Sequence, residues 1–376
     1  MGAAANRIKN LAEGLKNVEN EVMVICPLPN YPKGEIFKSY KNKFSVSETI
    51  NHITVKRFWI FPSKSTNPIL RILSMLSFSL SMWFSIFSLL KNKTDVFIIQ
   101  SPPLLVGFSG LLLSKVLRSK NILNVSDIWP LSAYELGVIK KGFFYKFLEI
   151  IEKVNYKLAD KIVGQSEETI HHISKIVDRD FLVYRNVPKL NNGKPKTKNG
   201  ENLKLVYAGL LGYAQGVLHI CESINFKELG AELHIYGGGI EEENIRKLAK
   251  DKTSNIFFYG LKKAEEIKNE INKFDVGLVP LKNKIHGAVP SKVFELMQSG
   301  IPILFFGEGE GAKIVVDHDI GISTNSDNIN DLKNKILDFK EIAPDKFREM
   351  SANSLNLHFD KYHLEYQLNN FIRFLG

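Results

Sequence analysis

The chain has 376 residues, of which 44% are hydrophobic and 24% charged, as in ordinary globular proteins. Single hydrophobic cores stop growing at about 250–300 residues, so we expect two domains. The two cysteines, Cys26 and Cys221, lie far apart and lack metal-ligand spacing, which argues against a disulfide scaffold or a zinc site and favours a reduced, cytoplasmic setting. The formal charge of +10 favours an anionic partner, but no nucleic-acid-binding motif accompanies it, so we expect no nucleic acid.

Short apolar runs alternate with helical patterns through the first half of the chain. Strands are expected at residues 21–26, 52–60, 95–100, 121–125 and 161–164, and helices at residues 3–15, 104–117, 143–158 and 167–176. This alternation predicts a doubly wound sheet of parallel strands, here a first domain of residues 1–185. The opening residues read as an amphipathic helix rather than a signal peptide.

Residues 69–90 form an apolar stretch about long enough to span a bilayer. A polar residue recurs every three or four positions within it, at Arg71, Ser74, Ser77, Ser81, Ser85 and Ser88. On a helix these residues form one narrow polar stripe. We therefore expect a helix buried in or against the sheet, with an exposed face that dips into a membrane, rather than a transmembrane span that would interrupt the βαβ pattern.

After a polar linker at residues 186–202, the alternation of strands and helices restarts. Strands are expected at residues 203–208, 231–236, 255–259, 275–279 and 303–306, and helices at residues 215–225, 240–250, 264–273, 291–299 and 332–339. Residues 203–355 are thus a second doubly wound α/β domain, and the two domains are expected to face each other across a cleft. A helix at residues 357–374, within a tail of residues 356–376, has no strand to follow and is expected to pack back on the domain junction.

Residues 285–304 carry the strongest candidate site. Pro290 and Ser291 predict the start of a helix with Ser291 as its N-cap, and Lys292 and Glu295 then lie on the first turn. Free backbone N–H groups beside a lysine suit a diphosphate, and an ionised glutamate accepts hydrogen bonds from ribose hydroxyls. The alternative is that these residues only cap the helix, meet solvent and favour the helix dipole.

Glycine-rich turns follow two strands of the second domain. Residues 209–212 and 237–239 end strands where the ligands of parallel sheets gather, and glycine lets the backbone approach a phosphate. Each turn taken alone is more often a tight connection between strand and helix than a ligand site. In the first domain, Asp127 follows a strand end, either to face the cleft or to form a turn before Pro130.

Lysines interleave with aromatic residues at residues 140–147 and also punctuate residues 33–43. Such a mixture is typical of a surface that touches anionic lipid headgroups. We therefore expect peripheral association with an anionic inner-membrane surface.

Several motifs occur in a recognisable order: Gly2-Ala3-Ala4-Ala5-Asn6-Arg7, Ser101-Pro102-Pro103-Leu104, Asp127-Ile128-Trp129-Pro130, Arg185-Asn186, Ala208-Gly209, Ala214-Gln215-Gly216 and Pro290-Ser291-Lys292-Val293-Phe294-Glu295. With these motifs, nearly the whole chain resembles bacterial GT-B glycosyltransferases of the large retaining family four, in the surface-polysaccharide branch that includes N-acetylfucosamine-type transferases. The resemblance implies two Rossmann-like domains, a donor held mainly by the C-terminal one, retention, and neither a metal nor another cofactor. On the hinge or acceptor side it implicates Gly2, Asn6, Arg185 and Asn186.

The sequence departs from the family pattern at four places. Glu295 matches the second of two paired glutamates, but Gly287 occupies the first position. Gln215 stands where many relatives have lysine, and Leu131 stands where glutamate usually follows the tryptophan motif. Relatives begin with an apolar strand before the first helix, and we expect that strand to be missing here, which would leave neighbouring strand edges unpaired.

The expected function is transfer of an N-acetylamino sugar from a UDP-linked donor to a lipid-linked or growing surface polysaccharide, such as O-antigen, capsule or exopolysaccharide. Lys292 and the 209–212 turn would stabilise the departing diphosphate, Glu295 would hold the ribose, and Asp127 would position the acceptor or sugar. The residues expected to bind the donor are Gly209, Gly212, Gln215, Gly238, Gly239, Pro290, Ser291, Lys292 and Glu295.

Two alternatives stay open: a GT-B nucleotide-sugar epimerase, and an inactive donor-binding or scaffold subunit, which Gly287 and Leu131 would fit. A metal-dependent transferase of the GT-A type is disfavoured. Its Asp-x-Asp pattern occurs at residues 178–180 and 317–319, but neither site follows an apolar strand into the expected cleft.

Overall fold

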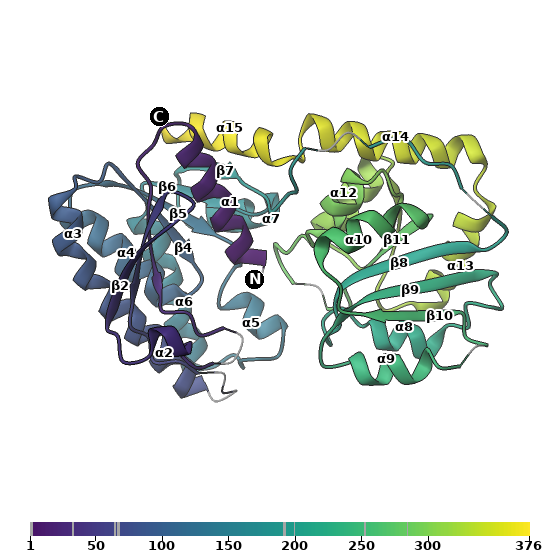
Figure 1. Cartoon of the computed structure of the whole chain (residues 1–376), viewed down its shortest axis with the longest axis horizontal. Helices are drawn as coiled ribbons and strands as arrows, with labels where there is room; N and C mark the ends of the chain where they lie inside the picture. Colours follow the sequence, from purple (N-terminus) through teal and green to yellow (C-terminus); the bar gives the residue numbers. More distant parts are fainter. Residues whose placement is uncertain are drawn as a thin grey trace. The chain divides into compact units, whose positions relative to one another are not determined.

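A computed structural model describes residues 3–31, 34–63, 65, 68–190, 193–198, 200–251, 253–283 and 285–376 (Figure 1). The chain divides into two compact units. Unit 1 comprises Met1–Arg185 with Leu368–Gly376, and unit 2 comprises Asn186–Gln367.

Unit 1 contains two sheets and the helices that cover them. Its strands are β1 (Met23–Pro27), β2 (Ser45–Ile50), β3 (Ile53–Phe58), β4 (Val96–Ser101), β5 (Lys120–Val125), β6 (Lys161–Gly164) and β7 (Asp180–Val183). Its helices are α1 (Ala3–Asn17), η1 (Lys38–Tyr40), α2 (Pro68–Ser81), η2 (Met82–Ser85), α3 (Ile86–Lys91), α4 (Leu104–Val116), α5 (Leu131–Glu135), α6 (Phe143–Leu158) and α7 (Glu167–Ser174).

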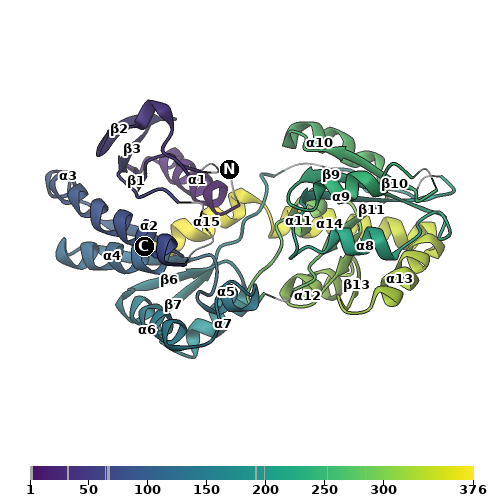
Figure 2. The ribbon, with the colours of Figure 1, turned by 90° about the horizontal axis from the view of Figure 1, so that it is seen from below.

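The prediction of a single sheet in unit 1 was wrong, because the described strands form two sheets. One has the order β1-β3-β2, with β2 antiparallel to β3, and the other is the parallel sheet β4-β5-β6-β7 (Figure 2). β1 and β4 share no backbone hydrogen bonds, so each has one edge without a strand neighbour among the described residues. Helix α1 packs against both sheets, since Leu11 and Leu15 lie in the core of the larger sheet and Ala12 packs with β3.

Unit 2 is one sheet of six parallel strands in the order β10-β9-β8-β11-β12-β13. The strands are β8 (Leu203–Leu210), β9 (Ala231–Gly238), β10 (Ile256–Gly260), β11 (Val276–Pro280), β12 (Ile303–Phe306) and β13 (Gly321–Thr324). The helices are α8 (Val217–Ser223), α9 (Glu242–Leu248), α10 (Ala264–Glu270), η3 (Ile271–Lys273), α11 (Lys292–Gln298), α12 (Glu310–Asp317), α13 (Ile329–Glu341) and α14 (Pro344–Asp360). This is the doubly wound order, in which ligands collect at the carboxyl ends of the central strands.

The expected single tail helix is two helices, α14 and α15 (Leu364–Leu375). Helix α14 ends at Asp360. In the connection to α15, the Tyr362 carbonyl accepts a hydrogen bond from the His358 ring at 2.9 Å, and the Leu364 N–H donates to the Pro188 carbonyl at 2.8 Å. From Leu368 onward the chain belongs to unit 1, in which Leu368 packs beside α1.

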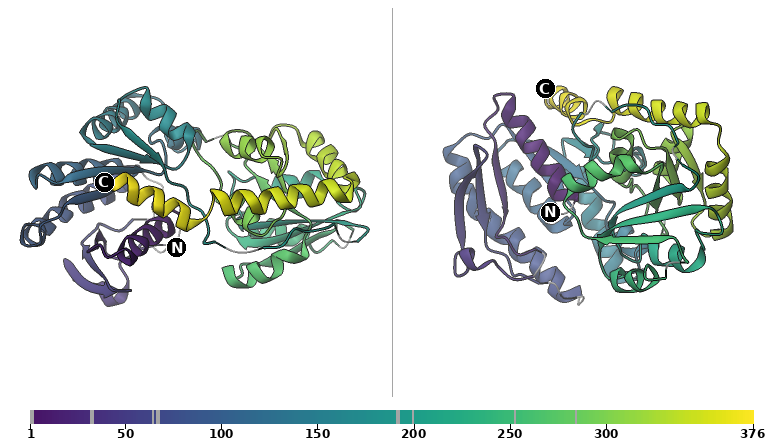
Figure 3. Two further views of the ribbon diagram at one scale, coloured as in Figure 1. Left: turned by 90° about the horizontal axis from the view of Figure 1, so that it is seen from above. Right: turned by 45° about the vertical axis from the view of Figure 1, so that its right-hand side comes forward.

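The apolar stretch at residues 69–90 is helical and packs on unit 1 along one side, as expected, since Phe78 and Met82 cluster with Phe58 of β3, while its other side is exposed. Among the described residues one helix, Leu70–Lys91, is long and apolar enough to cross a membrane by length and composition, and only 33% of its most apolar window is buried. It runs through α2, η2 and α3 and packs beside α4, as Figure 3 shows.

Candidate functional site

Two glycine turns of unit 2 meet at the carboxyl edge of its sheet. The pairing of β8 with β9 continues through Gly209 opposite Gly237 to Leu210 opposite Gly238, and a Cβ on Gly237 would overlap the Gly209 carbonyl oxygen. Beyond the strands, the Leu211 N–H donates to the Gly238 carbonyl at 3.0 Å, and the Glu241 N–H donates to the Leu211 carbonyl at 3.2 Å. The two turns therefore form one continuous backbone surface that has room only for glycine at its tightest point.

Lys292 of α11 lies against the first of these turns. A Cβ on Gly209 would overlap the end of the Lys292 side chain, so the missing side chain of Gly209 makes room for the lysine. The Lys292 ammonium lies 5.4 Å from the centroid of the Tyr207 ring, and the Tyr207 hydroxyl donates to the Leu210 carbonyl. The lysine and the turn that the sequence assigns to one site do lie together.

The Lys292 ammonium is a half-buried cation. Burial lowers its pKa from the ordinary lysine value, and the nearby charge of Glu295 partly opposes that effect. In the described part of unit 2 no carboxylate approaches Lys292 within ion-pair distance. Such a cation favours an anionic ligand, because the ligand's charge would compensate the cost of burying the ammonium.

The start of α11 differs from the expected capping pattern. Ser291 occupies the N-cap position, but its backbone is helical and its side chain caps no backbone N–H. Instead the Ser291 hydroxyl donates to Glu295 Oε1 at 3.2 Å, and Glu295 is exposed. The prediction of a serine cap was wrong because the hydroxyl prefers the charged carboxylate; Pro290 precedes it and accepts from the Val293 N–H at 3.1 Å.

Two acceptors without partners lie in the same turns. Gln215 Oε1 and Glu241 Oε2 are buried, and neither has a hydrogen-bond partner among the described residues. Gln215 is held in place through its N–H, which donates to the Gly212 carbonyl at 3.1 Å. A buried acceptor without a donor is costly, so both atoms suit the hydroxyl groups of a ligand.

The second turn is closely packed at its last glycine. A Cβ on Gly239 would overlap the Leu211 carbonyl, whereas one on Gly238 would meet the Glu242 side chain at 3.1 Å. Gly239 is therefore required by the backbone of the neighbouring turn, and Gly238 is the more open of the two expected donor-binding positions.

Asp127 follows β5 in unit 1, as expected. Burial raises the pKa of its carboxyl to about 6, and the Arg7 guanidinium limits that rise. Arg7 is itself buried, which lowers its pKa to about 10, and its guanidinium lies 5.5 Å from the centroid of the Tyr184 ring. A half-buried carboxyl with a pKa near neutrality is suited to position or exchange a proton.

A chain of amide contacts fixes the surroundings of Asp127. Arg7 Nη2 donates to Asn124 Oδ1, and Asn124 Nδ2 donates to Gln100 Oε1 at 2.9 Å. Gln100 Nε2 in turn donates to the Ser126 hydroxyl, next to Asp127. Arg7 Nε and Nη1 are buried without hydrogen-bond partners in the described part of unit 1.

The residues expected on the hinge or acceptor side have varied surroundings. Gly2 lies outside the described residues, and Asn6 is exposed on α1. Arg185 and Asn186 are the last and first residues of the two units, respectively, and Arg185 is buried, with Nη1 donating to the Gln165 carbonyl at 3.4 Å.

Sequence reasoning overlooked Tyr207 and Glu241, and it used Arg7 only as part of a motif. Tyr207 and Glu241 each lie two residues from a glycine turn, which was the available signal. Burial, and then Glu241, raises the pKa of Tyr207, so the two residues lie in one electrostatic environment. Among the described residues no group of three or more His, Cys, Asp or Glu side chains could hold a metal ion.

Comparison with known proteins finds a family model that matches most of unit 2. Residues 189–355 match the family model "Glycosyl transferases group 1". WbjE of Pseudomonas aeruginosa, named as a glycosyltransferase, is 27% identical over 62% of this chain and 62% of its own length. WcaI of Escherichia coli K12, named as a colanic acid biosynthesis glycosyl transferase, is 22% identical over 77% of this chain and 76% of its own. The chain thus spans about three fifths of WbjE.

Solved structures share the fold over the whole chain. Sucrose-phosphate synthase of Thermosynechococcus elongatus has a TM-score of 0.73 at 14% identity, covering 100% of this chain and 93% of that protein. Anabaena HepE, solved in complex with UDP-glucose, has a TM-score of 0.62 at 14% identity, covering 95% of this chain and 99% of that protein. The chain therefore has the GT-B fold, and its residues 189–355 are similar to the glycosyl transferases of group 1.

Proposed function

We propose that this chain transfers a sugar from a nucleotide donor, with retention and without a metal, to a growing surface polysaccharide or its lipid-linked precursor. The observation that carries the proposal is the half-buried Lys292 ammonium, held against the Gly209 turn without a carboxylate partner among the described residues. Its natural counter-charge is a diphosphate.

The neighbouring groups fit the rest of a nucleotide sugar. Glu295 is exposed beside Lys292 and can accept from ribose hydroxyls, while Gln215 Oε1 and Glu241 Oε2 are acceptors for hydroxyls closer to the turns. As the bond to the sugar breaks, negative charge grows on the diphosphate, and the preorganised Lys292 and backbone N–H groups stabilise it. HepE, solved with UDP-glucose, supports a UDP-linked donor; an N-acetylamino sugar is our proposal for the transferred group.

For the acceptor, we propose a lipid-linked glycan at the inner face of the plasma membrane, where the chain would work as a cytoplasmic, peripherally bound enzyme. The names of WbjE and WcaI, the second of them from colanic acid biosynthesis, support a polysaccharide. In unit 1, Asp127 would position the acceptor hydroxyl or the sugar, because its carboxyl has a pKa of about 6.

The test is a panel of UDP-sugars assayed with and without lipid-linked acceptors. We expect sugar transfer only when an acceptor is present, and a Lys292→Ala variant should lose about 100- to 1,000-fold in kcat, the range for removing one group that stabilises a developing oxyanion. Lys227→Ala is the matched control, since Lys227 is exposed and precedes β9 at the opposite edge of the sheet.

Three results would refute the proposal. Conversion of the donor sugar without an acceptor would identify an epimerase instead. Tight UDP binding without turnover for any donor would identify a binding subunit. Equal turnover of wild type and Lys292→Ala would remove the lysine from the mechanism.

A further inference from the structure

The helix that runs through α2, η2 and α3 has its polar side facing the protein. The Ser81 hydroxyl donates to the Trp59 carbonyl at 2.5 Å, the Ser77 hydroxyl accepts from the Phe61 N–H at 2.8 Å, and the Ser88 hydroxyl accepts from Lys56. Ser77 and Ser81 are four positions apart and Ser81 and Ser88 seven, so all three lie on one helical face. The polar stripe thus forms hydrogen bonds to β3 and to the segment that follows it.

A second set of polar contacts joins the same helix to α4. The Ser79 hydroxyl donates to the Leu105 carbonyl at 2.6 Å, the Ser109 hydroxyl donates to the Ser79 carbonyl at 2.7 Å, and Trp83 Nε1 donates to the Ser109 hydroxyl at 2.8 Å. Because these bonds tie the helix to unit 1 along its length, it cannot cross a bilayer without losing them.

The outer face carries large apolar side chains at helical spacing: Leu73, Leu76, Leu80, Phe84, Phe87 and Leu90. Leu80 is 60% exposed, Phe87 74% and Leu90 67%. Isolated exposed leucines are ordinary on proteins, but a continuous row along one helix marks a surface that contacts something apolar. We call this row of six residues the apolar face.

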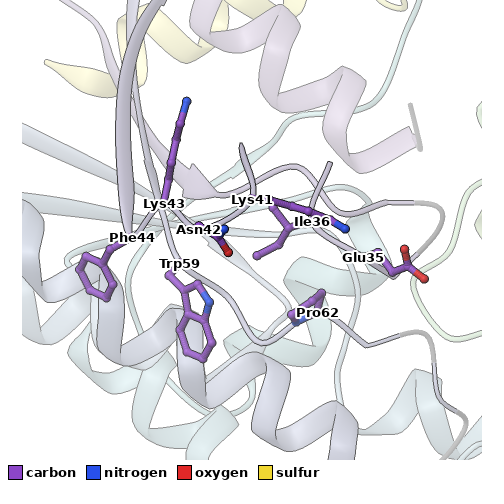
Figure 4. Close-up of a pocket in the computed structure, with 8 residues that line it drawn as sticks. All are labelled: Glu35, Ile36, Lys41, Asn42, Lys43, Phe44, Trp59 and Pro62. Atoms are coloured by element: carbon purple, nitrogen blue, oxygen red, sulfur yellow. The ribbon is translucent and has the colours of Figure 1, made fainter. Parts of the chain in front are cut away.

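Aromatic residues outside the helix extend the apolar face. Phe44 packs edge-on against Phe84, with ring centroids 5.0 Å apart. Phe44 and Trp59 also line a hollow of about 720 Å³ together with Lys41 and Lys43. Figure 4 shows the two aromatic rings side by side, with the Lys43 side chain directed away from them.

The charges around the apolar face have the sign that an anionic bilayer requires. Leu70–Lys91 contains no Asp or Glu, and exposed basic residues lie near both of its ends, Arg71 at one and Lys91 and Lys93 at the other. Lys41 and Lys43 add two more cations at the hollow, against one carboxylate, Glu35. A helix that lies flat in the headgroup layer combines these features: apolar residues directed into the lipid and cations level with the phosphates.

We propose that the apolar face of α2, η2 and α3, with Phe44 and the lysine-lined hollow beside it, is the surface by which unit 1 lies on an anionic lipid bilayer. The inference rests on the proposed function in one respect only: a lipid-linked acceptor gives the enzyme a reason to lie on a membrane. It assigns a docking surface, whereas the donor site lies in unit 2.

The test is co-sedimentation of the whole chain with vesicles of phosphatidylcholine, alone or mixed with phosphatidylglycerol. We expect binding to the mixed vesicles, and at least about a tenfold lower partition coefficient for the triple variant Leu80→Ser, Phe84→Ser and Phe87→Ser, because binding scales with buried apolar area. Phe359→Ser, which removes an exposed phenylalanine from unit 2, is the matched control and should bind like wild type.

Circular dichroism checks that the triple variant is folded. If it is unfolded, the single variant Phe87→Ser is used in its place, and we expect a smaller loss of vesicle binding. Equal binding by wild type and folded variant would overturn the proposal. So would a dimer in light scattering that the variant abolishes while vesicle binding is unchanged, since the apolar face would then meet a second copy. Lys292→Ala should bind vesicles normally, so a failure of the donor-site hypothesis leaves this test readable.

Discussion

At the scale of single residues, Gly209 makes the position of Lys292 possible. The φ of Gly209 is not in the left-handed region, so alanine fits its backbone, but the added Cβ would overlap the lysine side chain. We expect Gly209→Ala to leave the free energy of unfolding within about 1 kcal/mol of wild type, because a flexible side chain can move aside. UDP affinity, measured by calorimetry, should fall about tenfold or more.

The matched control for this substitution is Gly142→Ala. Gly142 has an extended backbone, and a Cβ there meets nothing within 4 Å. UDP affinity of Gly142→Ala should equal that of wild type. A Gly209→Ala variant that binds UDP as tightly as wild type would mean that the ammonium need not occupy the position seen here.

Asp127 contributes a stability effect of predictable sign. Its pKa is raised to about 6 by burial, whereas the unfolded value is 3.8, so the folded state holds its proton more tightly. Ionised Asp127 therefore destabilises unit 1, fully above about pH 6 and not at all below the unfolded pKa. We expect Asp127→Asn to stabilise the chain by about 1–3 kcal/mol at pH 7.5 and to show no gain at pH 3.8 or below, measured by urea unfolding. The same variant should lose sugar transfer.

A stability gain with loss of activity is typical of a carboxylate kept in an unfavourable environment for its chemistry. Asp180→Asn, on the exposed start of β7, is the control and should give no such pH-dependent gain. If Asp127→Asn instead lowered stability at pH 7.5, the carboxylate would be stabilised by its surroundings, and a role in proton exchange would lose its basis.

At the scale of elements, the helix through α2, η2 and α3 has serines facing the protein and leucines facing outward, so replacing a serine should destabilise it more than replacing a leucine. Ser81 is buried and donates to the Trp59 carbonyl, so Ser81→Val should cost about 1–3 kcal/mol by leaving that carbonyl without its donor and crowding the contact. Leu80, one residue earlier, points outward, and Leu80→Ser should stay within about 0.5 kcal/mol of wild type in urea unfolding. The opposite ranking would mean that the serines face outward.

The strand-end rule accounts for what the sequence predicted best. Lys292 and Gly209 come from distant segments, yet β8 and β11 are neighbours in the sheet, so the elements that follow them share one edge. Alternation of apolar runs with helices located most elements within a few residues. It missed β2, whose alternating polar residues are mostly exposed, and the four-residue edge strands β7 and β13. It also missed helix α12.

Other features depend on tertiary contacts that no local pattern contains. The serine stripe at residues 69–90 was visible in the sequence, but a stripe does not say which side faces the protein; the carbonyl of Trp59 and the N–H of Phe61 decide that. Likewise, the pattern at Ser291 predicts a cap, while the position of Glu295 gives the hydroxyl a different partner. Arg7 was noted in a motif, and only the fold reveals its approach to Asn124.

At the scale of the whole molecule, each unit has its own hydrophobic core. The clusters around Leu205 and Phe305 lie in unit 2, and those around Leu123, Leu11, Val55 and Phe58 lie in unit 1, including Phe371 of the returning tail. Separate cores unfold separately unless the interface between them is large and apolar.

We therefore expect two transitions in scanning calorimetry, each assignable by a perturbation of one unit. UDP should raise the transition temperature of unit 2 only, because a ligand stabilises the unit that it binds. At a UDP concentration 100 times its dissociation constant, the free energy of unfolding of unit 2 should rise by about 2.7 kcal/mol. Asp127→Asn at pH 7.5 should raise only the other transition. If UDP and the substitution shifted a single common transition, the two cores would unfold as one cooperative unit. Asp127→Asn would then also raise the unfolding temperature of unit 2, which holds the donor site.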